Sequence, residues 1–323
     1  MLIDKELSEK LRHLAFLGAL LVVVQHSFAE ATFLQAFVTR SLTRMAVPLF
    51  FVMSGFLLCK DYVMTFKWWK NKLLSRVLTL GIPYFVWALI SIALDMGKSK
   101  EFTFVWWMKA LGIINAAPLY AGHLWYVRML MLFVAFSIPI VLVLKYTRWV
   151  VPVSAMIVSI VFLRSAYWGS FFWFCVGAMI AFDNGRLLSA LANRDNRKLQ
   201  FLLMGAGVII ALVRTLAFRG VICLGSLLEH FSRATELLFV LVAIPLVWIA
   251  YDRIRICQKL TVCHSVFLSS FFVYCIHPYV YRLMPVSCFW LLRAVVVMVA
   301  CVMLYCLTKR ICPYALRVLS GGR

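Results

Sequence analysis

The sequence has few charged residues and very few acidic ones. Charged side chains make up 14% of the 323 residues, and Asp and Glu together number 12 against 33 Lys and Arg. Soluble domains carry about 25% charged residues. Hydrophobic residues reach 64% here, which excludes a water-soluble globule, a disordered chain, collagen and a disulfide-bonded miniprotein. The composition therefore predicts an all-α polytopic membrane protein with almost no domain outside the bilayer.

Paired cysteines and metal-binding spacings are also missing. The ten cysteines include no CxxC pair, so neither a zinc site nor a redox motif is indicated. The formal charge of +21 comes without a lysine-rich tail, a zinc-finger spacing or a basic groove interleaved with aromatics. We therefore expect no metal, no bound cofactor and no nucleic-acid partner. Excess Lys and Arg in short loops instead sets orientation and contacts membrane lipids.

Long apolar runs recur along the whole chain. A membrane helix needs about 20 mostly apolar residues, and ten runs qualify: 11–29, 43–60, 77–95, 124–144, 149–163, 167–183, 199–218, 234–251, 264–281 and 289–308. We predict about ten transmembrane helices around a polar cavity, in a single domain covering 1–323 with short tails. The fifth and sixth runs are short, and a single re-entrant hairpin is the alternative there. Residues 60–76 and 102–120 are expected to lie at opposite membrane surfaces.

The distribution of Lys and Arg predicts the orientation. If the first run leads outward, one side holds 21 of the 33 basic residues and the other holds 9, with 3 inside runs. Cytoplasmic loops are enriched in Lys and Arg. Both termini are therefore expected in the cytoplasm.

This orientation places several polar residues at one depth. Three of the six histidines, His26, His123 and His277, fall in the outer half of the membrane together with Arg44 and Arg128. Polar residues at such depth are costly and usually face a cavity or each other. We expect an outward-facing polar chamber lined by these side chains.

Each of these residues also has a plainer interpretation. A lone histidine near the interface is more often a hydrogen-bonded anchor than a catalyst, Pro278 can simply mark a kink, and Arg44 can be an ordinary loop charge. Glu30 stands one helical turn after His26, where it either fixes the imidazole tautomer or is solvated. We assign no role to His13, His230 or His264.

Four short stretches resemble one known family. Residues 44–58 read RMAVPLFFVMSGFLL, residues 123–126 read HLWY, and residues 272–278 read FVYCIHP. Residues 72–87, with Arg76 and an Ile-Pro-Tyr run at 82–84, are similar to the entry of the third helix of the same family. All four resemble signatures of the bacterial acyltransferase-3 family, and they occur in the family's order.

One position departs from the family pattern. Members usually carry an arginine eleven residues before the first-helix histidine, where this chain has Ala15. Arg12 stands three residues earlier, which rotates its position about 60° around a helix. Either Arg12 still serves the same cytoplasmic opening, or Lys10 or Arg76 takes its task.

The resemblance implies transfer of an acyl group, commonly acetyl, from cytoplasmic acyl-CoA to a hydroxyl of a surface glycan or lipid-linked saccharide at the bacterial inner membrane. It implies a catalytic set made of His26, Arg44, His123 and His277. The donor is expected at Arg12, Lys72 and Arg76, and the acceptor at Trp125, Arg128 and Glu30. Acetyl-CoA is then a co-substrate. The alternative class is a transporter or flippase for an anionic or saccharide substrate, although the chain shows no repeat of the transporter kind.

Overall fold

The computed structural model describes residues 5–27, 32–60, 62–63, 65–95, 103–162, 166–193, 196–253, 264–285 and 289–322. Within these ranges the chain is helical and contains no strand, which confirms the all-α prediction.

The first half of the chain builds the centre and one flank. Its elements are α1 (Lys5–Gln25), α2 (Phe33–Ala36), η1 (Phe37–Ser41), η2 (Leu42–Met45), α3 (Ala46–Cys59), α4 (Phe66–Arg76), η3 (Val77–Gly81), α5 (Ile82–Asp95), α6 (Phe104–Ala110), η5 (Gly122–Leu124), α7 (Trp125–Ala135), α8 (Ser137–Thr147) and α9 (Val150–Val161). Of these, η1 and η3 are π-helical turns.

The second half supplies the two outer layers. Its elements are α10 (Ala166–Phe182), α11 (Arg186–Ala192), α12 (Arg197–Phe218), η7 (Gly225–Leu227), α13 (Leu228–Arg253), α15 (His264–Phe267), α16 (Ser270–Arg282), α17 (Trp290–Ile311) and α18 (Pro313–Ser320).

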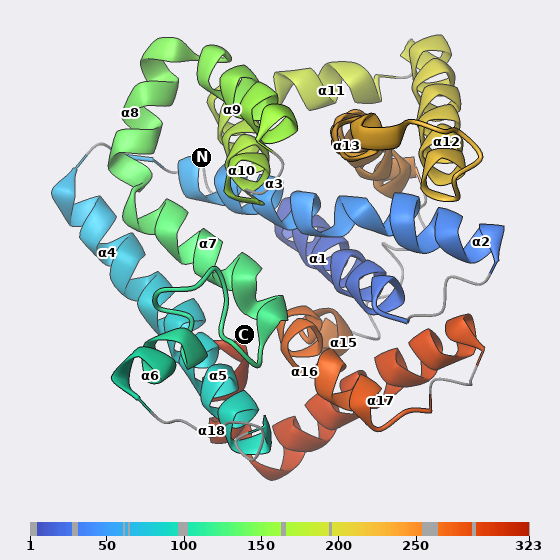
Figure 1. Ribbon diagram of the computed structural model, residues 1–323. Helices are drawn as coiled ribbons and strands as arrows, with labels where there is room; N and C mark the ends of the chain where they lie inside the picture. The colour runs from blue at the N-terminus through green and yellow to red at the C-terminus, as the bar shows by residue number, and fades with distance from the viewer. Residues whose placement is uncertain are drawn as a thin grey trace.

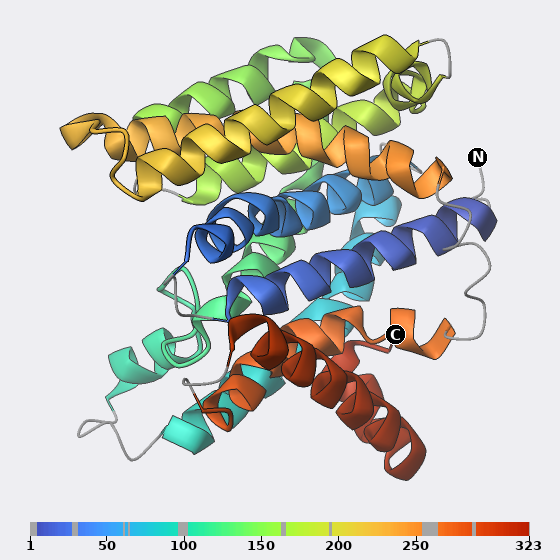
Figure 2. The ribbon, with the colours of Figure 1, turned by 90° about the vertical axis from the view of Figure 1, so that its right-hand side faces the viewer.

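Helix α1 lies at the centre of the bundle (Figure 1). Figure 2 shows it between α3 on one side and α16 and α17 on the other, and it contacts all three. Helices α12 and α13 pack together on the far side of α3. A residue at the end of α1 therefore faces elements from both halves of the sequence.

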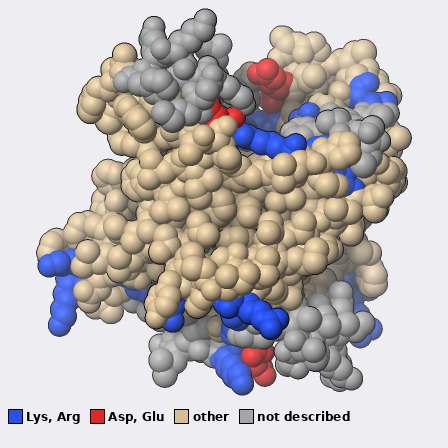
Figure 3. All heavy atoms as spheres, turned by 90° about the horizontal axis from the view of Figure 1, so that it is seen from below, with Lys and Arg blue, Asp and Glu red and all other residues tan. Residues whose placement is uncertain are grey.

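The surface has the pattern of a membrane protein. Figure 3 shows a broad uncharged band with Lys and Arg gathered toward its two margins. Large apolar side chains on the outside of α12, such as Phe201, Leu202 and Ile209, are exposed. By length and hydropathy, five described helical stretches can cross a membrane, or six if one bent pair forms a single span. The number of ten transmembrane helices thus stays a prediction, while the membrane character of the protein is supported.

Two segments differ from the expected helices, and a third region agrees with them. Residues 66–95 form one uninterrupted helical stretch, so the surface segment 60–76 continues directly into the next helix. The run 124–144 is bent by 73° between α7 and α8. Pro139 explains the bend, because it has no N–H to donate to the carbonyl of Ala135. The runs at 149–163 and 167–183 are two separate helices that pack together, α9 and α10.

Helices α3 and α10 touch backbone to backbone. A Cβ on Gly177 would lie 2.0 Å from the carbonyl oxygen of Val52, and one on Gly55 would lie 2.0 Å from that of Phe174. Small residues allow such an approach between membrane helices, where packing rather than hydrophobicity drives association. Because α3 follows Arg44 directly and α10 carries Trp173, this contact fixes two sides of the site described below.

Gly177→Ala is therefore expected to separate α3 from α10 and lower the melting temperature of the detergent-solubilised protein, at a cost of about 1–3 kcal/mol or more. Fluorescence-detected thermal unfolding measures it. Gly205→Ala on α12 is the matched control, because nothing lies within 4 Å of the added Cβ and alanine favours helix. Equal melting temperatures for the two variants would contradict the close-packing account.

Candidate active site

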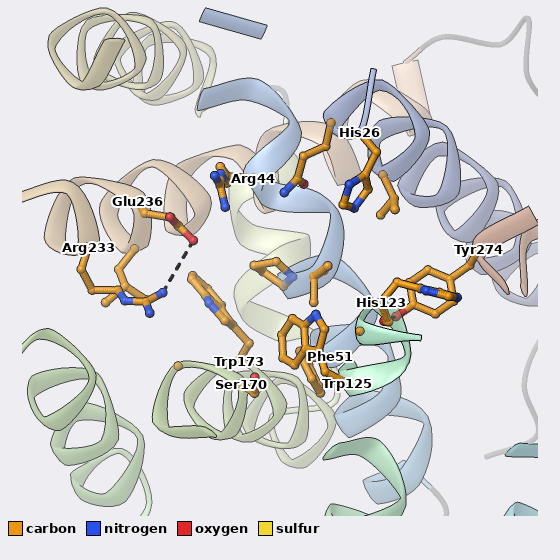
Figure 4. A pocket seen from close by; sticks show the side chains of 17 residues that line it. His26, Arg44, Phe51, His123, Trp125, Ser170, Trp173, Arg233, Glu236 and Tyr274 are labelled. Atoms are coloured by element: carbon orange, nitrogen blue, oxygen red, sulfur yellow. Dashed lines mark hydrogen bonds and ion pairs between the residues drawn. The ribbon is translucent and has the colours of Figure 1, made fainter. Parts of the chain in front are cut away.

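A cavity of about 410 Å³ opens beyond the end of α1. Its lining comes from seven regions: the end of α1 with His26, η2 with Arg44, α3 with Phe51, the η5–α7 junction with His123 and Trp125, α10 with Ser170 and Trp173, α13 with Arg233 and Glu236, and α16 with Tyr274. We call it the outer cavity, after the side on which the sequence predicts it. Figure 4 shows His26 and His123 on one side of this cavity and Arg44, Arg233 and Glu236 on the opposite side. The cavity thus has a histidine side and an arginine side.

The three histidines predicted to share a chamber do come together. The ring centroid of His277 lies 5.2 Å from that of His26 and 5.8 Å from that of His123. His26 and His123 line the outer cavity. His277 is fully buried behind them and is not part of its lining. Any role of His277 in this arrangement is exerted through the other two rings.

A proline fixes the orientation of His277. The N–H of a residue at 278 would normally bond the carbonyl of Tyr274, but Pro278 has none. His277 Nδ1 donates to that carbonyl over 2.8 Å and lies 3.2 Å from the carbonyl oxygen of Val273. Nδ1 therefore carries the proton, and in the neutral ring Nε2 holds the lone pair. Nε2 is buried and has no hydrogen-bond partner among the described residues.

His123 is held against α16 by two hydrogen bonds. Its Nε2 donates to the carbonyl of Cys275 over 3.1 Å. The hydroxyl of Tyr274 donates to the carbonyl oxygen of His123. The HLWY and FVYCIHP stretches, 145 residues or more apart in sequence, thus form one unit.

Charged side chains from α13 complete the arginine side, and Arg214 from α12 supports them from outside the lining. Arg214 Nη2 donates to Glu236 over 2.7 Å, and its other donors reach the carbonyls of Arg40 and Ser232. Arg233 lies 3.9 Å from the other Glu236 oxygen. Arg233 and Glu236 were missed by the sequence reasoning. Their signal is an i, i+3 pair of opposite charges at the outer end of the run 234–251.

A second cavity, of about 460 Å³, lies along the other half of α1. Arg12 and Arg76 line this inner cavity together with apolar side chains, which include Leu57, Leu80 and Phe271. Tyr274 belongs to both linings. Its ring lies 6.5 Å from Phe50 and 5.7 Å from Tyr126, centroid to centroid. A layer of aromatic rings therefore stands between the two cavities.

Three predicted residues lie elsewhere. Lys72 lines neither described cavity, and its Nζ sits 5.8 Å above the Trp68 ring. Arg128 also lines neither, and donates instead to the carbonyl of Ile113 over 3.2 Å. The sequence predicts Arg128 in the same chamber as the histidines because it lies at the same depth. Its side chain leaves α7 in another direction. Glu30 lies outside the described residues.

The fold and the matched domain together define a membrane acyltransferase. Residues 11–310 match the acyltransferase domain of the acyltransferase-3 family, and the chain belongs to that family. No curated protein and no solved structure matches the chain significantly.

Pro278→Ala is expected to stabilise the protein while lowering acyl transfer. Alanine restores an N–H that takes the Tyr274 carbonyl, and removing a proline from a helix interior is worth about 3 kcal/mol. The same change takes the partner of His277 Nδ1 away and frees the ring to rotate. Melting temperature and initial transfer rate measure the two effects. A variant with an unchanged rate would show that the orientation of His277 does not matter.

Proposed function

We propose that the protein transfers an acyl group, acetyl in the simplest case, from cytoplasmic acyl-CoA to a hydroxyl of a saccharide at the outer face of the membrane. The carrying observation is the pair of cavities along α1 that share Tyr274: the inner one contains Arg12 and Arg76, and the outer one contains His26 and His123. Arg12 and His26 are 14 residues apart, or about 21 Å along a helix axis. That length suits a donor whose phosphates stay outside the hydrocarbon while its thioester arm reaches inward.

The orientation follows from the basic residues. The side that carries 21 Lys and Arg includes α4, which leads to Arg76 and the inner cavity. The positive-inside rule favours the cytoplasm for this side. Acyl-CoA then meets Arg12 and Arg76 from the cytoplasm, and the acceptor enters the outer cavity from the other face of the bacterial inner membrane.

The reaction needs a base, because a hydroxyl is a weak nucleophile. In our proposal the imidazole of His26 takes the hydroxyl proton while the hydroxyl oxygen attacks the thioester carbonyl carbon. Collapse of the tetrahedral intermediate breaks the C–S bond, and the proton on His26 passes to the departing thiolate. The products are the O-acyl ester and free CoA, so atoms and charge balance.

Two neighbours can assist His26. In our proposal His277, whose ring centroid lies 5.2 Å from that of His26, orients that ring, and His123 lies on the same side of the cavity. Negative charge on the thioester oxygen needs donors in a water-poor site. The indole N–H of Trp125 lines the same cavity and is our candidate.

Replacement of His26 tests the base. His26→Ala and His26→Gln should each lower the initial rate by about 10² to 10⁴, because glutamine keeps hydrogen bonding but cannot accept a proton at neutral pH. His277→Gln should cost less, since that ring does not line the cavity. Labelled acetyl-CoA and reconstituted protein give the rates, and size-exclusion profiles control for folding. If His277→Gln were the more severe change, the two roles would be exchanged.

Replacement of the inner arginines tests the donor site. Arg12→Gln and Arg76→Gln should each raise the KM for acyl-CoA about tenfold, the usual effect of losing one charge-assisted hydrogen bond. Lys70→Gln removes an exposed charge from the same helix as Arg76 and serves as the control. An equal KM for all three variants would mean that the basic residues of α1 and α4 attract acyl-CoA or lipid only through their general charge.

A further inference from the structure

The outer cavity carries positive charge that no acidic group offsets within the described part of the chain. Glu236 is the one acidic side chain in its described lining. The carboxylate already pairs with Arg214, 2.7 Å away and with a side chain only 6% exposed. Arg214 itself is not part of the lining. Arg44 and Arg233 share this single carboxylate with Arg214, so three guanidinium groups stand against one carboxylate and two positive charges are left unbalanced.

Arg44 differs from the structural arginines of this protein. Arg214 uses its donors on a carboxylate and two carbonyls, and Arg293 donates to the carbonyls of Ser27, Tyr281 and Met284. Arg44 makes no hydrogen bond and no close ion pair among the described residues, its Nε is buried, and the acidic group that acts on it is the shared Glu236. A guanidinium taken out of water with no hydrogen-bond partner is costly. Its position is explained if a ligand supplies the partner.

Arg233 has only a weak partner. Its nitrogen lies 3.9 Å from Glu236, too far for a hydrogen bond, and its side chain is 27% exposed. Figure 4 places Arg44 and Arg233 with Glu236 across the cavity from His26 and His123. A ligand that spans the cavity would have one end at the two guanidinium groups and the other at the imidazoles.

We propose that the acceptor is a saccharide that carries an anionic group, a carboxylate or a phosphate, held by Arg44 and Arg233 while a hydroxyl of the same molecule faces His26. This inference rests on the proposed function and narrows its substrate class. Guanidinium groups bind both anions through paired, charge-assisted hydrogen bonds. A cavity of about 410 Å³ falls within the usual range for small-molecule sites.

Three acceptors that differ only at C6 test the proposal: octyl glucoside, octyl glucuronide and octyl glucoside 6-phosphate, each below its micelle concentration. The full chain is reconstituted in phosphatidylcholine liposomes with labelled acetyl-CoA. Wild type should show a KM about tenfold lower for at least one charged acceptor than for the neutral one. The carboxylate and phosphate arms show which anion the site takes.

Variants of Arg233 test whether the preference for a charged acceptor depends on the outer cavity. Arg233→Gln should remove most of the preference with little change in KM for acetyl-CoA, and Arg233→Lys should keep part of it. Arg219→Gln, which removes an exposed charge outside the described lining, should keep all of it. Equal KM values in wild type, or a preference that survives in Arg233→Gln, would overturn the proposal. So would loss of the preference when phosphatidylglycerol replaces part of the phosphatidylcholine, because a lipid headgroup would then occupy the arginines.

Equilibrium binding separates this inference from the proposed transfer. Binding of octyl glucuronide to the His26→Ala protein should weaken about tenfold when Arg233→Gln is added. If that holds while wild type acylates no acceptor, the anion site stands and the transfer proposal fails. If neutral and charged acceptors are acylated equally well, transfer stands and the anion site fails.

Discussion

A polar group inside an apolar helix bundle must find its partner within the protein. This constraint fixes the outer half of the structure. Arg293 on α17 donates to carbonyls at the ends of α1 and α16, which joins the three helices behind His26. Arg214 on α12 bonds η1 and α13, which fixes the arginine side. His123 and Tyr274 join α7 to α16. The outer cavity forms where polar side chains that are not used in these networks face unfilled space.

The constraint also explains what could be predicted from sequence. The depth of a residue in the membrane follows from its position along an apolar run. The excess of Lys and Arg in the loops on one side predicts the orientation of each run. These two arguments placed His26, His123 and His277 at one depth, because each lies near the end of a run, and the structure shows that their rings also meet. The motif stretches added the family. None of this reasoning requires knowledge of which helices are neighbours.

Neighbours and side-chain directions could not be predicted, because depth says nothing about azimuth. Arg128 shares the depth of the histidines but donates to the loop carbonyl of Ile113. Nothing in the sequence distinguishes Arg233 and Glu236 from ordinary charges at a helix end, whereas the structure packs α13 against η2 and Arg44. The contact between α3 and α10 was equally hidden, because Gly55 and Gly177 remove the side chains that would hold these helices apart. A single sequence marks both glycines without showing that they meet.

Arg12 lies in the same cavity as the position at which the family carries its arginine. The family's arginine position is occupied here by Ala15, and Arg12 lies three residues earlier, about 4.5 Å lower on the helix axis and 60° around it. Both residues line the inner cavity, where Arg76 also points. Positions three apart are neighbours on one helix face, so the shift moves the guanidinium along this cavity without taking it to another side of α1. The small side chain of Ala15 leaves the space between Arg12 and the aromatic layer open. The unusual spacing therefore lengthens the path from arginine to histidine while keeping both on the same route.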